Sequence, residues 1–346
     1  MAKKIFIAAT SQNCGKTTTS IGLMHLARKK YRSVGFLKPL GPKPATFHRL
    51  SVDKDAALIA QVFDLEKELR WMSPVVVHPE TTRRVVDGKI SPNEFHERII
   101  RAYKELEKRC DFIIIEGSGH PGVGSVIKTS NAHIARMLNA PVLMITGGGL
   151  GNVVDQISMG LALFEKEGVE VRAVIANKLI PEKRERTLDY LTRALADEKM
   201  RVIGGVDYYP VLANPTLRRI SRLLGLPIHG NSREASRIIH HIQIGAASTQ
   251  RVTELIREPS LLIVTSSRDE LLVTLANLYK IPAYRQLIVG LVIPGTAPVS
   301  TITQMILDRS NIPYMRSEKH TTAELYRVVT EDVSKITAVD KENSQR

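Results

Sequence analysis

Residues 5–18 read I-F-I-A-A-T-S-Q-N-C-G-K-T-T, an apolar strand that leads through a Gly-Lys-Thr turn into a helical pattern. In a phosphate-binding loop, backbone N–H groups of such a turn bind the β-phosphate, and the lysine reaches the β- and γ-phosphates. Gly15 and Lys16 occupy these positions, and the hydroxyl of Thr17 would bind Mg²⁺. The following helix N-terminus favours anionic charge. The segment therefore predicts a nucleotide site.

The loop lacks one residue of the usual pattern, because Thr10 stands where a glycine is expected five residues before Gly15. The alternative is a tight strand–helix turn that contains Lys-Thr by chance. We favour the phosphate loop, since strand, turn, lysine, hydroxyl and helix follow in order. The residues that we assign to the nucleotide from this segment are Thr10, Asn13, Gly15, Lys16, Thr17 and Thr18.

Composition bounds the class of protein. With 346 residues and 43% hydrophobic content, the chain can bury a large core and is expected to form two domains. No run approaches 18 apolar residues, and Ile5–Ala9 is too short for a signal peptide. Cys14 and Cys110 are too few for a disulfide framework. These features predict a cytoplasmic protein without a membrane partner.

The net charge is +14, which favours anionic partners without selecting one. Nucleotide, acidic metabolite and an acidic partner protein all remain open. The basic residues are dispersed among acidic ones, aromatic content is 5%, and no nucleic-acid recognition signature occurs. Nucleic acid is therefore kept only as a minor alternative.

Apolar runs alternate with amphipathic stretches through the first two hundred residues, which predicts an α/β fold: a doubly wound, mainly parallel sheet covered on both faces. The expected strands are Lys4–Ala9, Ser33–Lys38, Asp111–Ile115, Pro141–Thr146, Val171–Asn177 and Val202–Val206. The expected helices are Asp55–Phe63, Pro92–Lys108, Ala132–Leu138, Val153–Glu167 and Arg184–Asp197.

A second, smaller α/β domain is expected after a helix at Thr216–Leu224. Its expected strands and helices are Leu261–Thr265, Gln286–Ile293, Arg268–Leu278 and Ser300–Ser310. We place the nucleotide-binding domain at 1–225, the second domain at 226–337 and a flexible, polar tail at 338–346.

Four charged residues are candidates for the site, and two of them, Glu116 and Lys38, lie at the ends of predicted strands, where ligands of parallel sheets bind. Glu116 ends an apolar strand, where a phosphate-loop fold holds Mg²⁺ or its water; the alternative is a surface or capping glutamate. Asp53 and Asp55 open the next helix, and spacing leaves open whether they cap it or complete the metal site. Lys38 would hold an anionic substrate or phosphate, or be an ordinary surface lysine.

Two further segments lie at the same expected edge of the sheet. Residues 117–124, G-S-G-H-P-G-V-G, form a glycine-dense loop suited to close ligand approach or to a lid, in which His120 acts in acid–base work or simply orients the loop. Asn177 ends a strand where phosphate-loop proteins read the purine base, and its amide could pair with adenine.

The set T-S-Q-N-C-G-K-T, V-G-F-L-K-P-L-G, D-K-D-A-A-L, I-I-I-E-G-S-G-H-P-G-V-G-S-V, S-N-A and A-N-K resembles dethiobiotin synthetase-like ATPase domains. The nearest variety stands at the N-terminus of long bacterial phosphotransacetylases and in stand-alone relatives. Residues from about 231 to 333 resemble the DRTGG domain that follows there. This domain keeps Arg268 of its namesake motif but has serine at the expected aspartate.

The resemblance implies ATP and Mg²⁺ as cofactors, metal contacts from Thr17, Asp55 and Glu116, adenine contact from Asn177, and a homodimer. It also implies that Lys38 handles a carbamate substrate, and so makes Lys16 and Lys38 the catalytic candidates. Asn13 replaces an acidic residue of dethiobiotin synthetase, and no chain remains for a transacetylase catalytic domain. Acetyl transfer by this chain alone is therefore not expected.

Three functions stay open at this point. The first is an ATP-dependent enzyme that phosphorylates a small carboxylate or carbamate, like a cyclo-ligase. The second, which we favour, is a nucleotide-dependent sensor or regulator linked to acetyl-phosphate and acetyl-CoA metabolism. The third is a nucleic-acid-associated ATPase, which is disfavoured because Ser11 stands where partition-type ATPases carry a signature lysine.

Overall fold

The computed structural model describes residues 2–47, 49–209 and 214–331. The chain divides into two compact units, Met1–Tyr208 and Tyr209–Arg346, which we describe separately. The predicted boundary at 225/226 lies later than this division, because the helix at Leu217–Leu224 packs into the core of the second unit. The predicted flexible tail, 338–346, lies outside the described residues.

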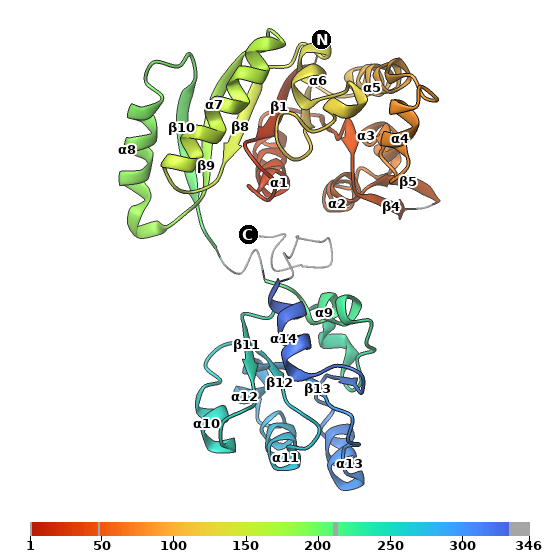
Figure 1. The fold of residues 1–346 in the computed structure, drawn as a ribbon, viewed down its shortest axis with the longest axis vertical. Coiled ribbons are helices and arrows are strands. Elements are labelled where there is room, and N and C mark those ends of the chain that lie inside the picture. The colour runs from red at the N-terminus through yellow and green to blue at the C-terminus, as the bar shows by residue number, and fades with distance from the viewer. Residues whose placement is uncertain (1, 48, 210–213, 332–346) are drawn as a thin grey trace. The chain divides into compact units, whose positions relative to one another are not determined.

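The first unit is built on six parallel strands, which agrees with the predicted α/β class (Figure 1). Their order across the sheet is β10 (Arg201–Asp207), β9 (Val171–Leu179), β8 (Val142–Thr146), β1 (Lys3–Ala9), β7 (Phe112–Glu116) and β2 (Val34–Leu37). The strands are parallel, so their carboxyl ends share one edge. The loops after β1, β7 and β9 therefore meet there.

Helices cover both faces of this sheet. Alternate residues of the strands, such as Phe6 and Ala8, share a core with α5 (Pro92–Glu107), α6 (Asn131–Met137), α7 (Gly151–Lys166) and α8 (Arg184–Ala194). Helix α1 (Lys16–Arg28) contacts β1, β2 and β7. Helix α2 (Lys54–Phe63) packs on β2, β4 and β5. This alternation along buried strands is the pattern of a two-sided parallel sheet.

Several short elements of the first unit were not predicted. An antiparallel hairpin of β4 (Pro44–Phe47) and β5 (Leu50–Asp53) separates β2 from α2. Strands β3 (Leu40–Gly41) and β6 (Val75–Val76) pair beside it, with α3 (Leu69–Met72) and α4 (Thr81–Val86) nearby in sequence. These strands are too short to give a readable alternation.

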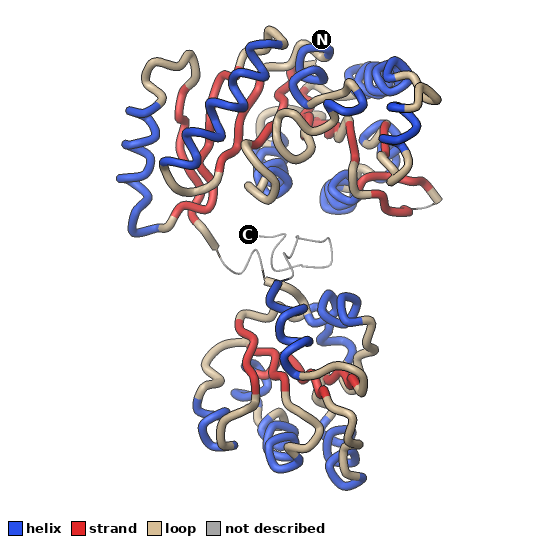
Figure 2. Tube along the Cα trace, in the orientation of Figure 1, coloured by secondary structure: helices blue, strands red, loops and turns tan. Residues whose placement is uncertain are grey.

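The second unit has its own parallel sheet, in the order β11 (His241–Ile244), β12 (Ser260–Ile263), β13 (Ile288–Pro294) and β14 (Tyr314–Ser317) (Figure 2). Leu262 faces a core with α10 (Thr249–Glu254), α11 (Asp269–Leu278) and α13 (Thr301–Ser310). Leu261 faces the other core, with α9 (Leu217–Leu224) and α14 (Thr322–Glu331). Helix α12 (Pro282–Leu287) precedes β13.

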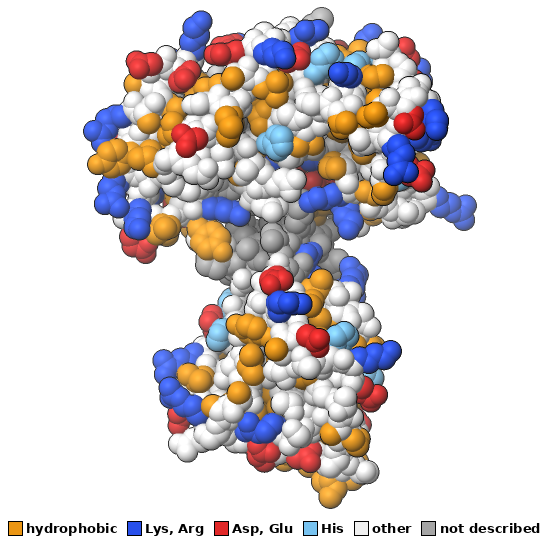
Figure 3. Space-filling model, viewed as in Figure 1, with side chains coloured by type: hydrophobic (Ala, Val, Ile, Leu, Met, Phe, Trp, Pro, Cys, Tyr) orange, Lys and Arg blue, Asp and Glu red, His pale blue; other side chains and the backbone are white. Residues whose placement is uncertain are grey.

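Among the described residues, every helix is too short or too polar to span a lipid bilayer. The surface carries both signs of charge. On the face shown in Figure 3, Lys and Arg side chains are dispersed among Asp and Glu side chains.

Candidate nucleotide site

The loop after β1 adopts the conformation that a glycine allows. Gly15 precedes α1 with φ of 89°, and a Cβ there would lie 2.0 Å from Asn177 Nδ2. Only glycine fits this combination of left-handed backbone and close approach. The amide of Asn177 donates to the carbonyl of Cys14 (2.8 Å), while its Oδ1 accepts from the backbone N–H of Lys178 (2.9 Å). Asn177 therefore holds the loop directly.

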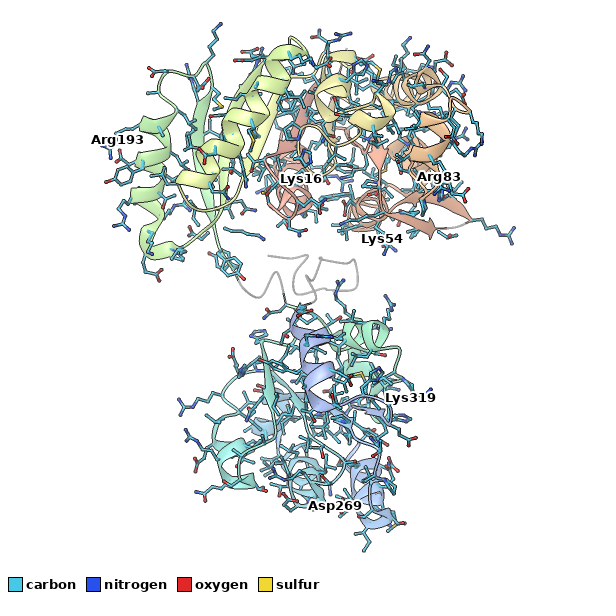
Figure 4. The ribbon with its side chains drawn as sticks, viewed as in Figure 1. Lys16, Lys54, Arg83, Arg193, Asp269 and Lys319 are labelled. Atoms are coloured by element: carbon cyan, nitrogen blue, oxygen red, sulfur yellow. The ribbon has the colours of Figure 1, made fainter. Side chains whose placement is uncertain are left out.

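Lys16 lies at the start of α1 (Figure 4), with only 8% of its surface exposed. Its ammonium donates to the carbonyl of Gly119 (2.7 Å) and to that of Ser11 (3.4 Å). The glycine-rich loop after β7 thus lies against the loop after β1. The two loops that the sequence assigned to one edge of the sheet are in direct contact.

A buried polar cluster joins α1, β2, β7 and α2. The hydroxyl of Thr17 donates to Glu116 Oε1 (3.1 Å), and Lys38 Nζ donates to the same oxygen (2.8 Å). Lys38 also contacts Asp55 Oδ2 (3.3 Å) and the carbonyl of Gly117 (3.0 Å). Lys38 and Glu116 are 2% and 0% exposed. The alternative interpretations of both residues as surface groups are therefore wrong.

The charges of this cluster depend on one another. Burial acts to lower the pKa of Lys38, but the carboxylates of Glu116, Asp55 and Asp53 outweigh it and raise that pKa above its ordinary value. Lys38 is thus held as an ammonium. Burial raises the pKa of Asp53, although the charge of Lys38 opposes this.

The two acidic residues at the start of α2 have different partners. Asp53 Oδ1 accepts from the backbone N–H of Asp55, and its Oδ2 accepts from that of Lys43. It is therefore the N-cap of α2. Asp55 instead approaches Lys38, next to Glu116. Asp53 therefore has the capping role, one of the two that spacing left open, whereas Asp55 belongs to the charged cluster, and its metal role stays a prediction.

One residue that positions the glycine-rich loop was missed. Asn131 Nδ2 donates to the carbonyls of Ser118 and His120 (2.6 Å each), and its Oδ1 accepts from the N–H of Ser118 (3.0 Å). Its place after the helix cap Ser130 was a usable signal. His120 Nδ1 accepts from the N–H of Gly122, which fits its orienting interpretation.

The donor set fits Mg²⁺ bound together with a nucleotide. Glu116 Oε2 is buried and has no hydrogen-bond partner among the described residues, so the carboxylate has an unused oxygen beside the Thr17 hydroxyl. Mg²⁺ in phosphate-loop sites takes one or two protein oxygens and completes its shell from phosphates and water. Within residues 2–47, 49–209 and 214–331, no three His, Cys, Asp or Glu side chains form a metal-binding group.

The structure thus brings Lys16, Thr17, Lys38, Asp55 and Glu116 together. The remaining candidates surround the loop: the hydroxyl of Thr10 lies 3.3 Å from that of Thr146, and Asn13 (φ of 59°) and Thr18 are exposed. Sequence reasoning did not single out Thr146, which lies at the end of β8 beside β1.

Residues 3–216 match a family model described as an AAA domain, AAA_26. Relatives of more than one kind align with the chain. A phosphate acetyltransferase of Synechocystis sp. is 25% identical over 270 residues, which is 77% of this chain and 38% of the relative. The one from Nitratidesulfovibrio vulgaris is 21% identical over 320 residues, or 90% of this chain and 44% of the relative. The chain thus spans less than half the length of these relatives.

A relative of the second kind is the ATP-dependent dethiobiotin synthetase BioD of Clostridium kluyveri, 27% identical over 261 residues, which is 70% of this chain and 99% of the relative. Among solved structures, apo McdA from Cyanthece covers 60% of this chain and 87% of its own, with 13% identity and a TM-score of 0.39. The family model covers most of the chain, including the loop, the buried cluster and Asn177. The chain belongs to the AAA_26 family of P-loop ATPase domains.

Proposed function

We propose that the first unit binds Mg-ATP. Lys16 would contact the phosphates, Thr17 and Glu116 would hold Mg²⁺, and Asp55 would orient its water shell. Bound Mg²⁺ would supply charge neutralisation at the phosphates. The observation that carries this proposal is the partly buried Thr17–Glu116 contact, beside which Glu116 Oε2 is buried and unused. Asn177 is proposed to contact adenine as well as the loop.

We propose further that the protein acts as a nucleotide-dependent sensor or regulator. Lys38, the residue that would handle a substrate, is 2% exposed and is engaged by Glu116, Asp55 and the carbonyl of Gly117. That arrangement supports a structural and electrostatic role better than substrate binding. A DRTGG-like character of the second unit, homodimerisation and a protein partner belong to the same proposal.

The alignment with phosphate acetyltransferases supports a link to acetyl-phosphate or acetyl-CoA metabolism. The match to the Nitratidesulfovibrio vulgaris protein covers 90% of this chain, more than the 3–216 segment alone could supply. It must therefore include part of the second unit. A regulator with both units would share its architecture with part of those longer proteins.

An ATP-dependent enzyme that phosphorylates a small carboxylate or carbamate is the second candidate. It is favoured by the alignment with BioD, which spans 99% of that relative. It is also favoured by the position of Lys38, whose ammonium lies next to the proposed metal carboxylates.

Calorimetric titration with ATP, in the presence and absence of Mg²⁺, tests the nucleotide proposal. A phosphate-release assay on the same sample, with and without diaminopelargonate plus bicarbonate, separates the two functions. Tight binding with negligible release under all conditions would support the regulator. Release stimulated by that substrate pair would establish the enzyme, and absence of any ATP binding would refute both.

A further inference from the structure

The second unit contains a cavity of about 560 Å³ that no part of the nucleotide proposal uses. Its lining includes His240, Pro259 and Gln286, which immediately precede or lead into β11, β12 and β13. The cavity therefore lies at the amino-terminal edge of the second sheet. This volume is within the range of cavities that bind small ligands.

The lining is rich in cations. Arg237, Lys280 and Arg285 line the cavity together with one carboxylate, that of Glu234. Both carboxylate oxygens of Glu234 are already engaged: Oε1 accepts from Arg285 Nη2 (2.6 Å), and Oε2 accepts from Arg237 Nη1 (2.9 Å) and the hydroxyl of Tyr279 (2.8 Å). The negative charge of Glu234 is thus already paired with neighbouring residues. The cavity lining therefore carries more positive than negative charge.

Both arginines have several hydrogen-bond or ring partners. Arg237 also donates to the carbonyls of Ile288 (2.9 Å) and Gln286 (2.6 Å), which fixes its guanidinium against the start of β13. Arg285 makes a second bond to Glu234 through Nε and lies over the ring of Tyr279 at 5.4 Å. Guanidinium groups positioned in advance bind oxyanions with less loss of side-chain entropy.

From this arrangement we infer that the cavity is a binding site for a small metabolite that carries a phosphate or carboxylate group. Arg285 and Lys280 contact the oxyanion, and Arg237 adds a fixed positive charge behind them. Ile238, Pro259 and Pro282 supply apolar surface for the body of the ligand. Binding of this ligand needs no nucleotide. The inference rests on the proposed regulatory function only where it names the ligand as the effector of that regulation.

The test uses the full chain and two probes, inorganic phosphate and malonate, which separate phosphate from carboxylate ligands. Each is titrated calorimetrically at constant ionic strength set with sodium chloride. Arg285→Ala and Lys280→Ala change exposed side chains, and circular dichroism checks their folding. Arg309→Ala and Lys319→Ala are the matched controls, because both are exposed residues of the second unit outside the cavity lining (Lys319 is labelled in Figure 4).

We expect at least one probe to bind, about tenfold more weakly to each cavity variant and unchanged to each control, as loss of a charge-assisted hydrogen bond implies. Lys16→Ala separates this site from the phosphate loop: it should keep probe binding and lose ATP binding. Probe binding that is lost only in Lys16→Ala, or is equal in the cavity variants and the controls, would overturn the inference. So would the absence of binding by both probes. The probe titrations of the cavity variants and their controls do not depend on ATP binding by the first unit.

Discussion

The hydroxyl of Thr17 donates to Glu116 Oε1 over 3.1 Å, across 99 residues of sequence, from the helix that follows β1 to the end of the neighbouring strand β7. A hydroxyl from the first turn of α1 and a carboxylate from the end of β7 thus meet at one partly buried position. The unused oxygen of Glu116 lies at the same place. Lys16 and Lys38 are charged residues next to this pair in sequence or in contact with it.

Lys16→Ala should weaken ATP binding about 100-fold, because the ammonium makes charge-assisted contacts with two phosphates. Titration calorimetry with Mg-ATP measures the loss. The exposed Lys29→Ala, at the other end of the same helix, is the matched control and should bind as the unmodified protein does. ATP binding by Lys16→Ala at unchanged affinity would refute the loop assignment.

Glu116→Gln should weaken ATP binding in Mg²⁺ more than in EDTA, since glutamine keeps the shape but loses the anionic ligand. The comparison of the two conditions within one variant removes any general effect on folding. Equal losses with and without the metal would count against a metal role for this carboxylate.

Lys38→Met should lower the free energy of unfolding by about 3 kcal/mol or more, because it leaves Glu116 and Asp55 without their buried counter-charge. The double variant Lys38→Met, Glu116→Gln should recover part of that loss. Urea denaturation of the four proteins gives the coupling energy. Strictly additive effects would mean that the pair contributes nothing as a pair.

Asn177→Ala separates two roles of one amide. If the contact of Asn177 with Cys14 positions the loop, binding of ATP and of inorganic tripolyphosphate should both fall, by about tenfold for one lost hydrogen bond. If the amide reads only the base, tripolyphosphate binding should stay the same. We expect the first result, measured by calorimetry.

Acid should destabilise the second unit through Glu234. Burial acts to raise the pKa of this carboxyl, but hydrogen bonds from Arg285, Tyr279 and Arg237 outweigh it and hold the pKa below the usual 4.5. The folded state therefore binds fewer protons than the unfolded one. The contribution is present above pH 4.5 and is lost as the pH falls through the folded pKa.

Glu234→Gln should remove this dependence, so the difference in unfolding free energy between the two proteins should shrink as the pH falls below 4.5. Denaturation at a series of pH values measures it. A difference that is constant with pH would show that the charge of Glu234 does not stabilise the fold.

The sequence predicted the parts of the fold that depend on buried periodicity. The run Ile113–Ile115 predicted β7, and the convergence of parallel strand ends predicted that Glu116 lies near the loop of Lys16. It did not predict the burial of Lys38, which depends on surrounding structure such as α3, whose Met72 carbonyl accepts from the N–H of Lys38. The spacing of residues along β2 carries no information about its contact with α3.

Other misses have equally local causes. Strands β11 and β14 contain polar residues such as Gln243 and Arg316, whose side chains bond to backbone carbonyls inside the unit. Because such residues interrupt the apolar run, hydropathy alone does not identify the strand as buried. For Asn177, the chemistry of the amide suits a base and a loop carbonyl equally well, so only the three-dimensional contact distinguishes them.

The carbonyl of Gly119 accepts a hydrogen bond from the ammonium of Lys16, and a bound phosphate would compete with that carbonyl for the ammonium. A phosphate that displaced this carbonyl from the ammonium would give up a 2.7 Å bond, so its dissociation constant would be larger than for a loop in which that bond is already broken. When the phosphate leaves, the hydrogen bond between Lys16 and the carbonyl of Gly119 would form again. The environment of the residues after β7 would then differ between the free and the phosphate-bound protein, and a spectroscopic label at that loop would report the occupancy of the site without touching the ligand.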